Sequence, residues 1–209
     1  MKQAAIAFRV HSGWAAAVAV CVNKGAPVVL ARQRVHLVET FTYEFRQPYH
    51  TAGKMLLAQA REFISRMQAE ARRLAYVAIR ELASRTQEQG VKLTRCGFLL
   101  SSGRPLPALE KILASHALIH TADGELFREA ILHASSRCGL RDFRIKDKEL
   151  VEHAGLVLHL KSDDLMGRVT ELGRPFGSPW SQDEKFATLA AWLAMSAPPR
   201  NSRVTRKSR

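Results

Sequence analysis

The sequence has few of the features that mark disulfide-rich, membrane-spanning or secreted proteins. Its three cysteines, Cys21, Cys96 and Cys138, are an odd number at unrelated spacings, which predicts buried thiols rather than disulfides or a zinc site. The longest apolar stretch, residues 14–22, is shorter than the roughly 18 residues of a transmembrane helix and lacks a signal-peptide layout. We therefore expect a cytoplasmic protein that does not enter a membrane.

Nucleotide-binding and nucleophile motifs are also missing. The sequence has no Gly-x-x-x-x-Gly-Lys, no Gly-x-Gly-x-x-Gly after an expected strand and no nucleophile elbow. The Ser-Ser-Gly-Arg turn that ends at Arg104 follows an expected strand and precedes a helix, so its N–H groups and guanidinium are candidates to contact a phosphate. Most such turns have no ligand, and both interpretations stay open.

Acidic residues are few relative to basic ones. The 209-residue chain has 32 Lys and Arg against 19 Asp and Glu, a formal net charge of +13. Such a charge favours polyanionic partners, although an arginine-rich composition alone also produces it. Residues 198–209 carry part of the excess without apolar periodicity, so we expect one domain at residues 1–197 followed by a disordered basic tail.

The N-terminal part of the chain predicts a meander of three antiparallel strands. Residues 4–10 alternate between apolar and other positions, residues 14–22 are apolar throughout, and residues 28–38 alternate again. Ser12-Gly13 is interpreted as a bulge or bend between the first two strands.

Helices and strands alternate after the meander. A long amphipathic helix is expected from Ala52 to Gln89, because apolar residues recur every three or four positions and arginines surround them. A central fourth strand is expected at residues 91–100. The later elements are a short helix near residues 106–114, a helix capped by Thr121 or Asp123, a fifth strand at 143–146, a helix within 148–160, a helix over 163–172 capped by Ser162, and a last helix behind a capping box at Ser181 and Glu184.

This order of elements resembles that of the ribonuclease H-like proteins, and the later elements are similar in spacing to bacterial Holliday-junction resolvases. The resemblance covers about residues 4–195 and lies in architecture rather than motif. It implies an α/β fold with a mixed five-stranded sheet flanked by helices, in which strands four and five are parallel to strand one. It also implies carboxylates at the ends of the central strands that hold two divalent ions, usually Mg²⁺.

Two of the implied acids are missing. Residues 8–11 (Phe-Arg-Val-His) stand where the first-strand acid is required, and residues 95–98 (Arg-Cys-Gly-Phe) stand where the fourth-strand acid is required. Asp183 and Glu184 do begin the last helix, but helix capping explains both without a metal. The sequence therefore predicts a domain that lacks two-metal nuclease activity and has no cofactor.

A second constellation offers a different kind of enzyme. His116 and His120 are four residues apart, so on one helical turn their imidazoles share a face, with Asp123 or Glu125 as the candidate third ligand. This alternative is a metal-dependent nuclease or hydrolase with a relocated Zn or Mg site, to which Asp183 also contributes. The simpler interpretation makes Asp123 an N-cap and the two histidines polar loop anchors.

Candidate nucleic-acid-binding residues are basic and lie on the long helix, in the turn after strand four and in the tail: Arg66, Arg73, Arg80, Arg104, Arg203, Arg206 and Lys207. Such side chains can neutralise phosphates, and the sequence shows no evident base-reading element, so we expect binding to DNA or RNA without sequence preference, or else a protein partner on the same surface. The aromatic residues within 41–49 are candidates to stack bases or to cover the open end of the core.

Overall fold

Five strands form one mixed sheet with β1 at its centre. The computed structural model describes residues 1–101 and 105–196, so the predicted tail lies outside the described residues. The strands are β1 (Lys2–His11), β2 (Trp14–Asn23), β3 (Ala26–His36), β4 (Val91–Leu100) and β5 (Arg141–Lys146), in the spatial order β3-β2-β1-β4-β5. β1 to β3 form an antiparallel meander, and β4 and β5 run parallel to β1. The predicted fold class and strand directions are confirmed.

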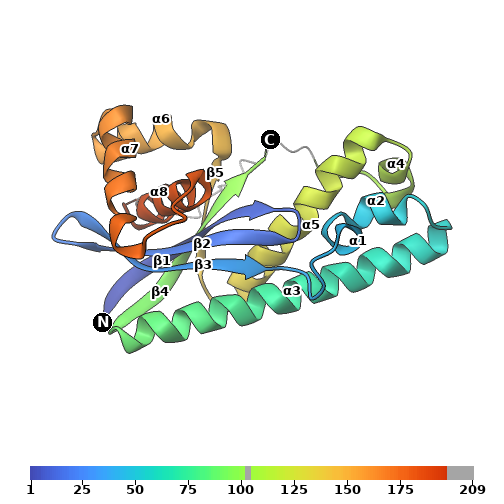
Figure 1. The fold of residues 1–209 in the computed structure, drawn as a ribbon, viewed down its shortest axis with the longest axis horizontal. Coiled ribbons are helices and arrows are strands. Elements are labelled where there is room, and N and C mark those ends of the chain that lie inside the picture. The colour runs from blue at the N-terminus through green and yellow to red at the C-terminus, as the bar shows by residue number, and fades with distance from the viewer. Residues whose placement is uncertain (102–104, 197–209) are drawn as a thin grey trace, which may run out of the picture.

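Helices cover both faces of this sheet (Figure 1). They are α1 (Tyr43–Arg46), α2 (Pro48–Ala52), α3 (Leu57–Glu88), α4 (Leu109–Leu113), α5 (His116–Arg137), α6 (Leu150–Leu158), α7 (Ser162–Glu171) and α8 (Gln182–Ser196), with 3₁₀ turns η1 (Asp147–Glu149) and η2 (Arg174–Phe176). α3 and α5 pack on one face, and α6, α7 and α8 cover the other. No helix in the described part of the chain is long and apolar enough to cross a membrane.

β1 is buried on both faces, which explains its continuous apolar run. Ile6 and Phe8 point into the core shared with α3 and α5, whereas Ala5 and Ala7 point into the core shared with α8. Because side chains alternate along a strand, Arg9 belongs to the α8 side. β3 lies at the edge and alternates between buried and more exposed positions, as its sequence predicts.

The turn between β1 and β2 is a tight hairpin, so of the two interpretations of Ser12-Gly13 the bend is confirmed and the bulge is wrong. The strands pair up to His11 and Trp14, which leaves only two residues to reverse the chain. Gly13 has φ 82°, and a Cβ at this position would lie 2.7 Å from Cγ of Arg46. Glycine is required here by the left-handed backbone and by the close approach of Arg46.

Three predicted helix starts are corrected. The segment from Ala52 does not begin the long helix: Pro48–Ala52 is the separate helix α2, and α3 begins at Leu57. α5 is one helix from His116, with Asp123 in its interior, because packing against α2, α3 and α4 extends it upstream of the apparent cap. Ser162 is the first residue of α7 rather than its cap, and the capping residue Lys161 makes no side-chain cap hydrogen bond.

α8 lies close to the centre of the sheet, and this proximity places its first turn beside the end of β1. A Cβ at Gly97 would be 2.9 Å from Cβ of Ala7 and 3.0 Å from the carbonyl oxygen of Ala190, so no larger residue fits without movement. The predicted capping box is confirmed, because the Ser181 N–H donates to Oε2 of Glu184 at 2.8 Å.

Candidate functional site

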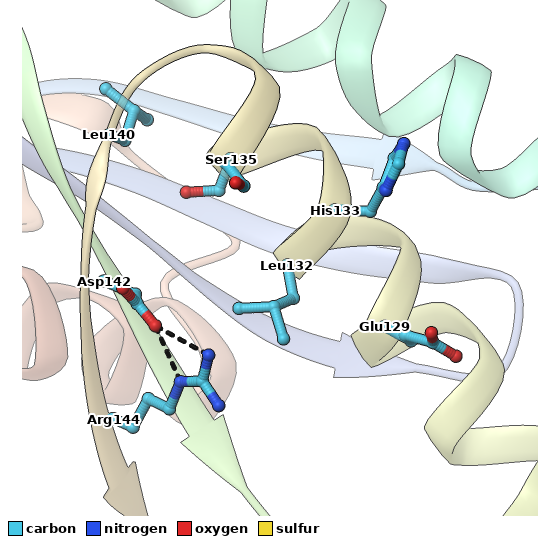
Figure 2. A pocket seen from close by; sticks show the side chains of 8 residues that line it. Glu129, Leu132, His133, Ser135, Leu140, Asp142 and Arg144 are labelled. Atoms are coloured by element: carbon cyan, nitrogen blue, oxygen red, sulfur yellow. Dashed lines mark hydrogen bonds and ion pairs between the residues drawn. The ribbon is translucent and has the colours of Figure 1, made fainter.

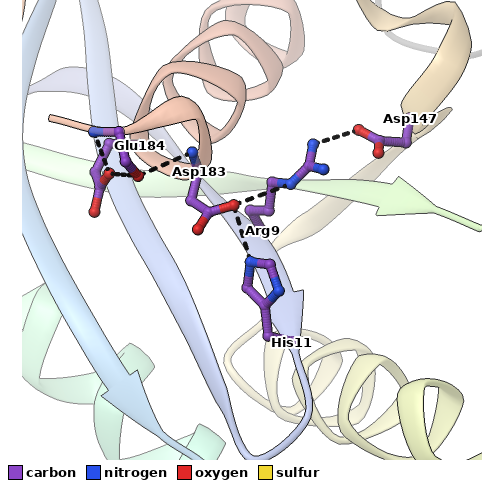
Figure 3. A network of polar contacts seen from close by, with 6 residues as sticks. Arg9, His11, Asp147, Asp183 and Glu184 are labelled. Carbon is purple, nitrogen blue, oxygen red and sulfur yellow. Dashed lines mark hydrogen bonds and ion pairs between the residues drawn. The ribbon is translucent and has the colours of Figure 1, made fainter.

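An arginine on the central strand joins two carboxylates at the edge of the sheet (Figure 3). Nη1 of Arg9 donates to Oδ1 of Asp147 at 2.6 Å, and its Nε lies 3.2 Å from Oδ1 of Asp183. Asp147 begins η1 directly after β5, and Asp183 lies in the first turn of α8. The carboxyl end of the central parallel strands therefore holds a cation supplied by the protein itself.

His11 extends this group along β1. Its Nε2 lies 2.9 Å from the same Oδ1 of Asp183 that faces Arg9, so one carboxylate oxygen serves two nitrogen groups. The Arg9 guanidinium also lies 4.6 Å from the ring centroid of Phe186, one turn further along α8. About a fifth of each side chain is exposed, 23% for Arg9 and 22% for Asp183, so the pair is partly shielded from water. Partial shielding strengthens the attraction relative to a surface ion pair.

The neighbouring position on β4 is apolar. The register pairs Phe8 with Phe98, so the next residues along the two strands are Arg9 and Leu99, and Leu99 is buried in the α8 core. Further back on β4, Nη1 of Arg95 donates to the carbonyl oxygen of Ala194 at 2.6 Å, and burial is the main cause that lowers the Arg95 pKa. We predicted that residues 95–98 would stand beside the first-strand position of the site. The β4 residue beside Arg9 is instead Leu99, one residue after that segment.

The two acids at the start of α8 have different surroundings. Asp183 belongs to the cluster of Arg9, His11, Asp147 and Asp183, which we call the Arg9 group, whereas Glu184 turns back to the backbone N–H and hydroxyl of Ser181. Of these two candidate catalytic acids, Asp183 is therefore the one that contacts side chains of another element, Arg9 and His11 of β1.

The second predicted constellation is brought together in part. His116 and His120 lie on one face of α5, and their ring centroids are 4.4 Å apart. His50 of α2 joins them, with its centroid 4.4 Å from that of His120 and 5.5 Å from that of His116. Glu125 is directed elsewhere: its Oε1 accepts from Ser101 Oγ at 2.5 Å and from Arg128 Nη2 at 2.9 Å. Of the two interpretations, the shared helical face of His116 and His120 is confirmed, and their role as loop anchors is wrong because both lie in α5. His50 was missed.

Asp123 is a buried residue that contacts one member of this histidine group, His50. Its carboxylate is 2% exposed and accepts the backbone N–H of Tyr49 at 2.7 Å and Nδ1 of His50 at 2.5 Å. Burial raises the Asp123 pKa above its ordinary value, although the bonds from His50 and Tyr49 act in the opposite direction. Asp123 is therefore neither an N-cap nor a third member of the histidine group, but the buried acceptor that orients His50.

Aromatic and cationic side chains form a layered group beside the β1–β2 hairpin. His11 stacks on Trp14 with 4.5 Å between ring centroids, and the Arg34 guanidinium lies 3.7 Å from a Trp14 ring centroid. Phe41 lies 5.7 Å from the guanidinium of Arg34 and 4.6 Å from that of Arg46. We call these five residues the hairpin stack. Through His11 it is continuous with the Arg9 group.

The predicted aromatic cluster is divided by the fold. Phe41 and Tyr43 are exposed, whereas Tyr49 is buried and Phe45 packs on the core near Phe63. The core-covering interpretation is thus confirmed for Tyr49, whereas exposed Phe41 belongs to the hairpin stack and its stacking on bases stays a prediction.

The arginines predicted on the long helix lie on the exposed side of α3. Arg73 pairs with Glu39, which lies in the segment between β3 and Phe41. Arg66 and Arg80 are exposed, and the Arg66 guanidinium is 5.8 Å from the Phe63 ring centroid. The other predicted basic residues, Arg104, Arg203, Arg206 and Lys207, lie outside the described residues.

A shallow cavity of about 370 Å³ opens between α5 and β5 (Figure 2). Its walls include Glu129, His133, Asp142 and Arg144, and the Asp142 carboxylate is 2.7 Å from the Arg144 guanidinium. The ion pair satisfies both charges. Figure 2 shows Glu129 and His133 on α5, well apart from this pair, so the cavity does not gather a nucleophile and a base.

Comparison with known proteins identifies the fold. No protein-family model matches the sequence, and no curated protein matches it. The chain is similar to "T. thermophilus RuvC in complex with Holliday junction substrate", with a TM-score of 0.52, 10% identity, and coverage of 93% of this chain and 91% of that chain. The fold is ribonuclease H-like. A second solved structure, "Thermus thermophilus RuvC structure", aligns with a TM-score of 0.47, 12% identity and 91% of each chain.

Several residues at the ribonuclease H-like sheet edge were not anticipated. Asp147 directly follows β5, which runs parallel to β1 and β4, and this position was the available signal, because the carboxyl ends of parallel strands meet at one edge. The pairing of Arg9 with acids was also missed, because Asp147 and Asp183 lie far from it in the sequence. His50 carried no signal in the local pattern, because its partners lie far away in the sequence.

Proposed function

We propose that this ribonuclease H-like domain binds nucleic acid and does not cut it by a two-metal mechanism. The observation that carries the proposal is the position of Arg9, whose guanidinium contacts both Asp147 and Asp183 at the end of the sheet. A guanidinium between two carboxylates neutralises the charge that would otherwise attract a divalent ion, and its own charge repels one. Arg9 therefore takes the place of a metal ion at this edge.

The neighbouring side chains support the same conclusion. A two-metal centre needs oxygen ligands from several elements, and the β4 position beside Arg9 is the apolar Leu99. Gly97, the next β4 position on the α8 side, has no room for a side chain because Ala7 and Ala190 are so close. The described residues at this edge thus provide Asp147 and Asp183 as acids, both already engaged by Arg9.

The hairpin stack supports nucleic acid as the partner. It combines the two groups that bind unpaired nucleotides, aromatic rings for base stacking and guanidinium groups for phosphates. Arg34 and Phe41 are exposed, so both are accessible to a ligand. The formal net charge of +13 favours the same class of partner. The solved relative at a TM-score of 0.52 was determined with a Holliday junction, which makes branched DNA a natural test ligand.

The contacts expected from these residues carry no base-specific readout. Arg34 and Arg46 offer charge, and the exposed Phe41 offers a ring that every base can stack on, whereas the Trp14 ring lies between His11 and Arg34. We therefore propose binding with little sequence preference, in which the exposed arginines of α3, Arg66 and Arg80, extend the basic surface. A protein partner on the same surface is the competing outcome.

Fluorescence anisotropy across a salt series tests the binding. Labelled single strands, duplex and a four-way junction are titrated with native protein, an Arg34→Ala/Arg46→Ala variant and an Arg168→Ala control on α7. Each lost phosphate contact should reduce the log–log salt slope by about 0.9 on duplex and about 0.7 on single strands. The double variant should lose up to two contacts and the control none, with melting temperatures verifying that all three proteins are folded. Absence of binding at low salt would overturn the nucleic-acid assignment in favour of a protein partner.

A cleavage assay tests the second half of the proposal. The junction and an RNA–DNA hybrid should remain intact with Mg²⁺ or Mn²⁺. Cleavage that disappears in Asp183→Asn would show a working metal centre and contradict the proposal. Cleavage that persists in the variant identifies a contaminating nuclease, and purification is then repeated until native protein and variant can be compared without it.

A further inference from the structure

Three imidazoles converge at a point remote from the Arg9 group. One ring nitrogen from each of His50, His116 and His120 lies within 4.8 Å of the other two. The rings are steeply inclined to one another, with interplanar angles of 89°, 67° and 89°. Three nitrogens on tetrahedral zinc are about 3.3 Å apart, given a zinc–nitrogen distance of about 2.05 Å. His116 and His120 are exposed, so small rotations of their side chains close the difference.

The carboxylate behind His50 prepares it to bind a metal. Oδ2 of Asp123 is 2.5 Å from Nδ1 of His50, which places the ring proton on Nδ1 and leaves the Nε2 lone pair free. Asp123 is itself fixed by the backbone N–H of Tyr49 and is 2% exposed. A carboxylate that accepts from the far nitrogen of a ligating histidine is the usual support of a zinc-bound imidazole.

Helical geometry explains the other two ligands. His116, His120 and Asp123 are separated by four and three residues, so all three lie on the α5 face that meets α2. α5 supplies two nitrogens and the supporting carboxylate, and α2 supplies the third nitrogen. The site thus consists of elements that packing already holds together.

We infer that His50, His116 and His120 form a zinc site, with Asp123 as the positioning residue for His50. Imidazole nitrogen suits zinc and its first-row neighbours, whereas Mg²⁺ and Ca²⁺ take oxygen ligands. Three protein ligands leave a fourth coordination position open to water or a ligand, as in zinc sites that are not purely structural. The inference does not depend on the proposed nucleic-acid function, because neither the Arg9 group nor the hairpin stack contributes a ligand.

Zinc at this point would join the α2 segment to α5. α2 has five residues and is preceded by the four-residue α1, and neither helix is long enough to be stable alone. A ligand that binds only the folded state stabilises that state by linkage. Zinc should therefore raise the melting temperature as well as bind.

Direct metal binding tests the inference on untagged protein treated with a chelator. Zn²⁺ is titrated in competition with a chromophoric chelator, and Co²⁺ is added separately to record the visible absorption of a tetrahedral site. We expect one metal per chain, a Co²⁺ band displaced by Zn²⁺, and a higher melting temperature with Zn²⁺. His116→Gln and His120→Gln should each abolish stoichiometric binding. Both residues are exposed, so these variants should fold.

Two further variants distinguish zinc binding at the three histidines from nonspecific zinc binding. His133→Gln changes an exposed histidine elsewhere on α5 and should bind Zn²⁺ as the native protein does. Asp123→Asn keeps a similar shape but removes the carboxylate, and should weaken binding about 10–100-fold without changing the stoichiometry. The inference is overturned if native protein binds no stoichiometric metal, or if His116→Gln and His120→Gln bind it as tightly as His133→Gln.

Discussion

Arg9 and Asp183 meet between the central strand and the last helix, with Nε of the arginine 3.2 Å from Oδ1 of the aspartate. The same guanidinium reaches Asp147 at 2.6 Å, so one side chain connects β1, η1 and α8. These three segments are far apart in sequence, and the two ion pairs of Arg9 hold them together at this edge of the sheet.

Replacing Arg9 with aspartate should create a divalent-cation site. Arg9→Asp removes the resident cation and adds a third carboxylate beside Asp147 and Asp183, so repulsion among them should favour Mn²⁺ or Mg²⁺. Without metal the variant should be less stable than the native protein. Saturating Mn²⁺, at about 100 times its dissociation constant, should restore about 2.7 kcal/mol, measured by thermal melting with and without metal.

Arg9→Asn is the matched control for this prediction, because it has the shape of the aspartate without its charge. It should gain no stabilisation from Mn²⁺. Equal metal responses in the two variants would contradict the assignment of Arg9 as the group that occupies the cation position.

The contact at Gly97 predicts a stability difference between two glycine-to-alanine changes. Gly97→Ala places a methyl group 2.9 Å from Cβ of Ala7 and should cost about 1–3 kcal/mol through overpacking. Gly167→Ala lies within α7, where nothing approaches the added methyl within 4 Å, and should stabilise by about 0.5–1 kcal/mol. Urea unfolding of both variants measures the difference. A neutral Gly97→Ala would show that α8 moves away from the sheet easily.

The thiols of Cys96 and Cys138 should differ sharply in reactivity. Burial raises the Cys96 pKa far above the usual range, and burial also raises that of half-exposed Cys138, where Arg80 and Arg137 act in the opposite direction. A raised pKa means less thiolate at a given pH, so alkylation by iodoacetamide at about pH 8 should be slow. Cys138 should react first, and Cys96 only at the rate of unfolding.

Mass spectrometry of peptides after timed alkylation checks this order. Cys138→Ser should remove the earliest modification without accelerating that of Cys96. Modification of Cys96 at the rate of Cys138 in folded protein would show that the sheet centre opens far more often than its burial implies.

The hairpin stack predicts a preference for unpaired nucleotides. Phe41→Ala removes the exposed ring that lies beside Arg34 and Arg46, and should weaken binding to single strands by about 1–3 kcal/mol while affecting duplex less. Leu156→Ala, which removes an exposed apolar side chain on α6, serves as the control and should have no effect. Anisotropy with matched single-stranded and duplex probes measures both. Equal losses on the two probes would assign Phe41 a structural role only.

The sheet was predictable because its signals are local. Alternation in β3, the apolar runs of β2 and β4 and the glycine after α3 each determine one element from its own residues. The start of α5 was not predictable in the same way. Asp123-Gly124 has the composition of a helix start, but Ile119 and Ala122 are buried against neighbouring elements, and that burial continues the helix through both residues.

The candidate sites were less predictable, since each depends on contacts between distant parts of the chain. The pair His116 and His120 is visible from its four-residue spacing, but His50 joins it only because α2 packs on α5. Asp183 is visible from the capping pattern, but its partners Arg9 and Asp147 meet it only when β1, β5 and α8 share one edge. Local pattern gives candidate residues, and the packing of distant elements decides which of them meet.

The length of α3 has a consequence for how the molecule opens. Its 32 residues extend for about 48 Å, longer than the roughly 33 Å of a ten-residue strand, so its N-terminal part passes beyond the sheet to the region of α2 and α4 (Figure 1). Amide protons at the two ends of this one helix should therefore exchange by different routes. The C-terminal part is protected by the sheet and exchanges with global unfolding, whereas the N-terminal part exchanges whenever the small helices detach.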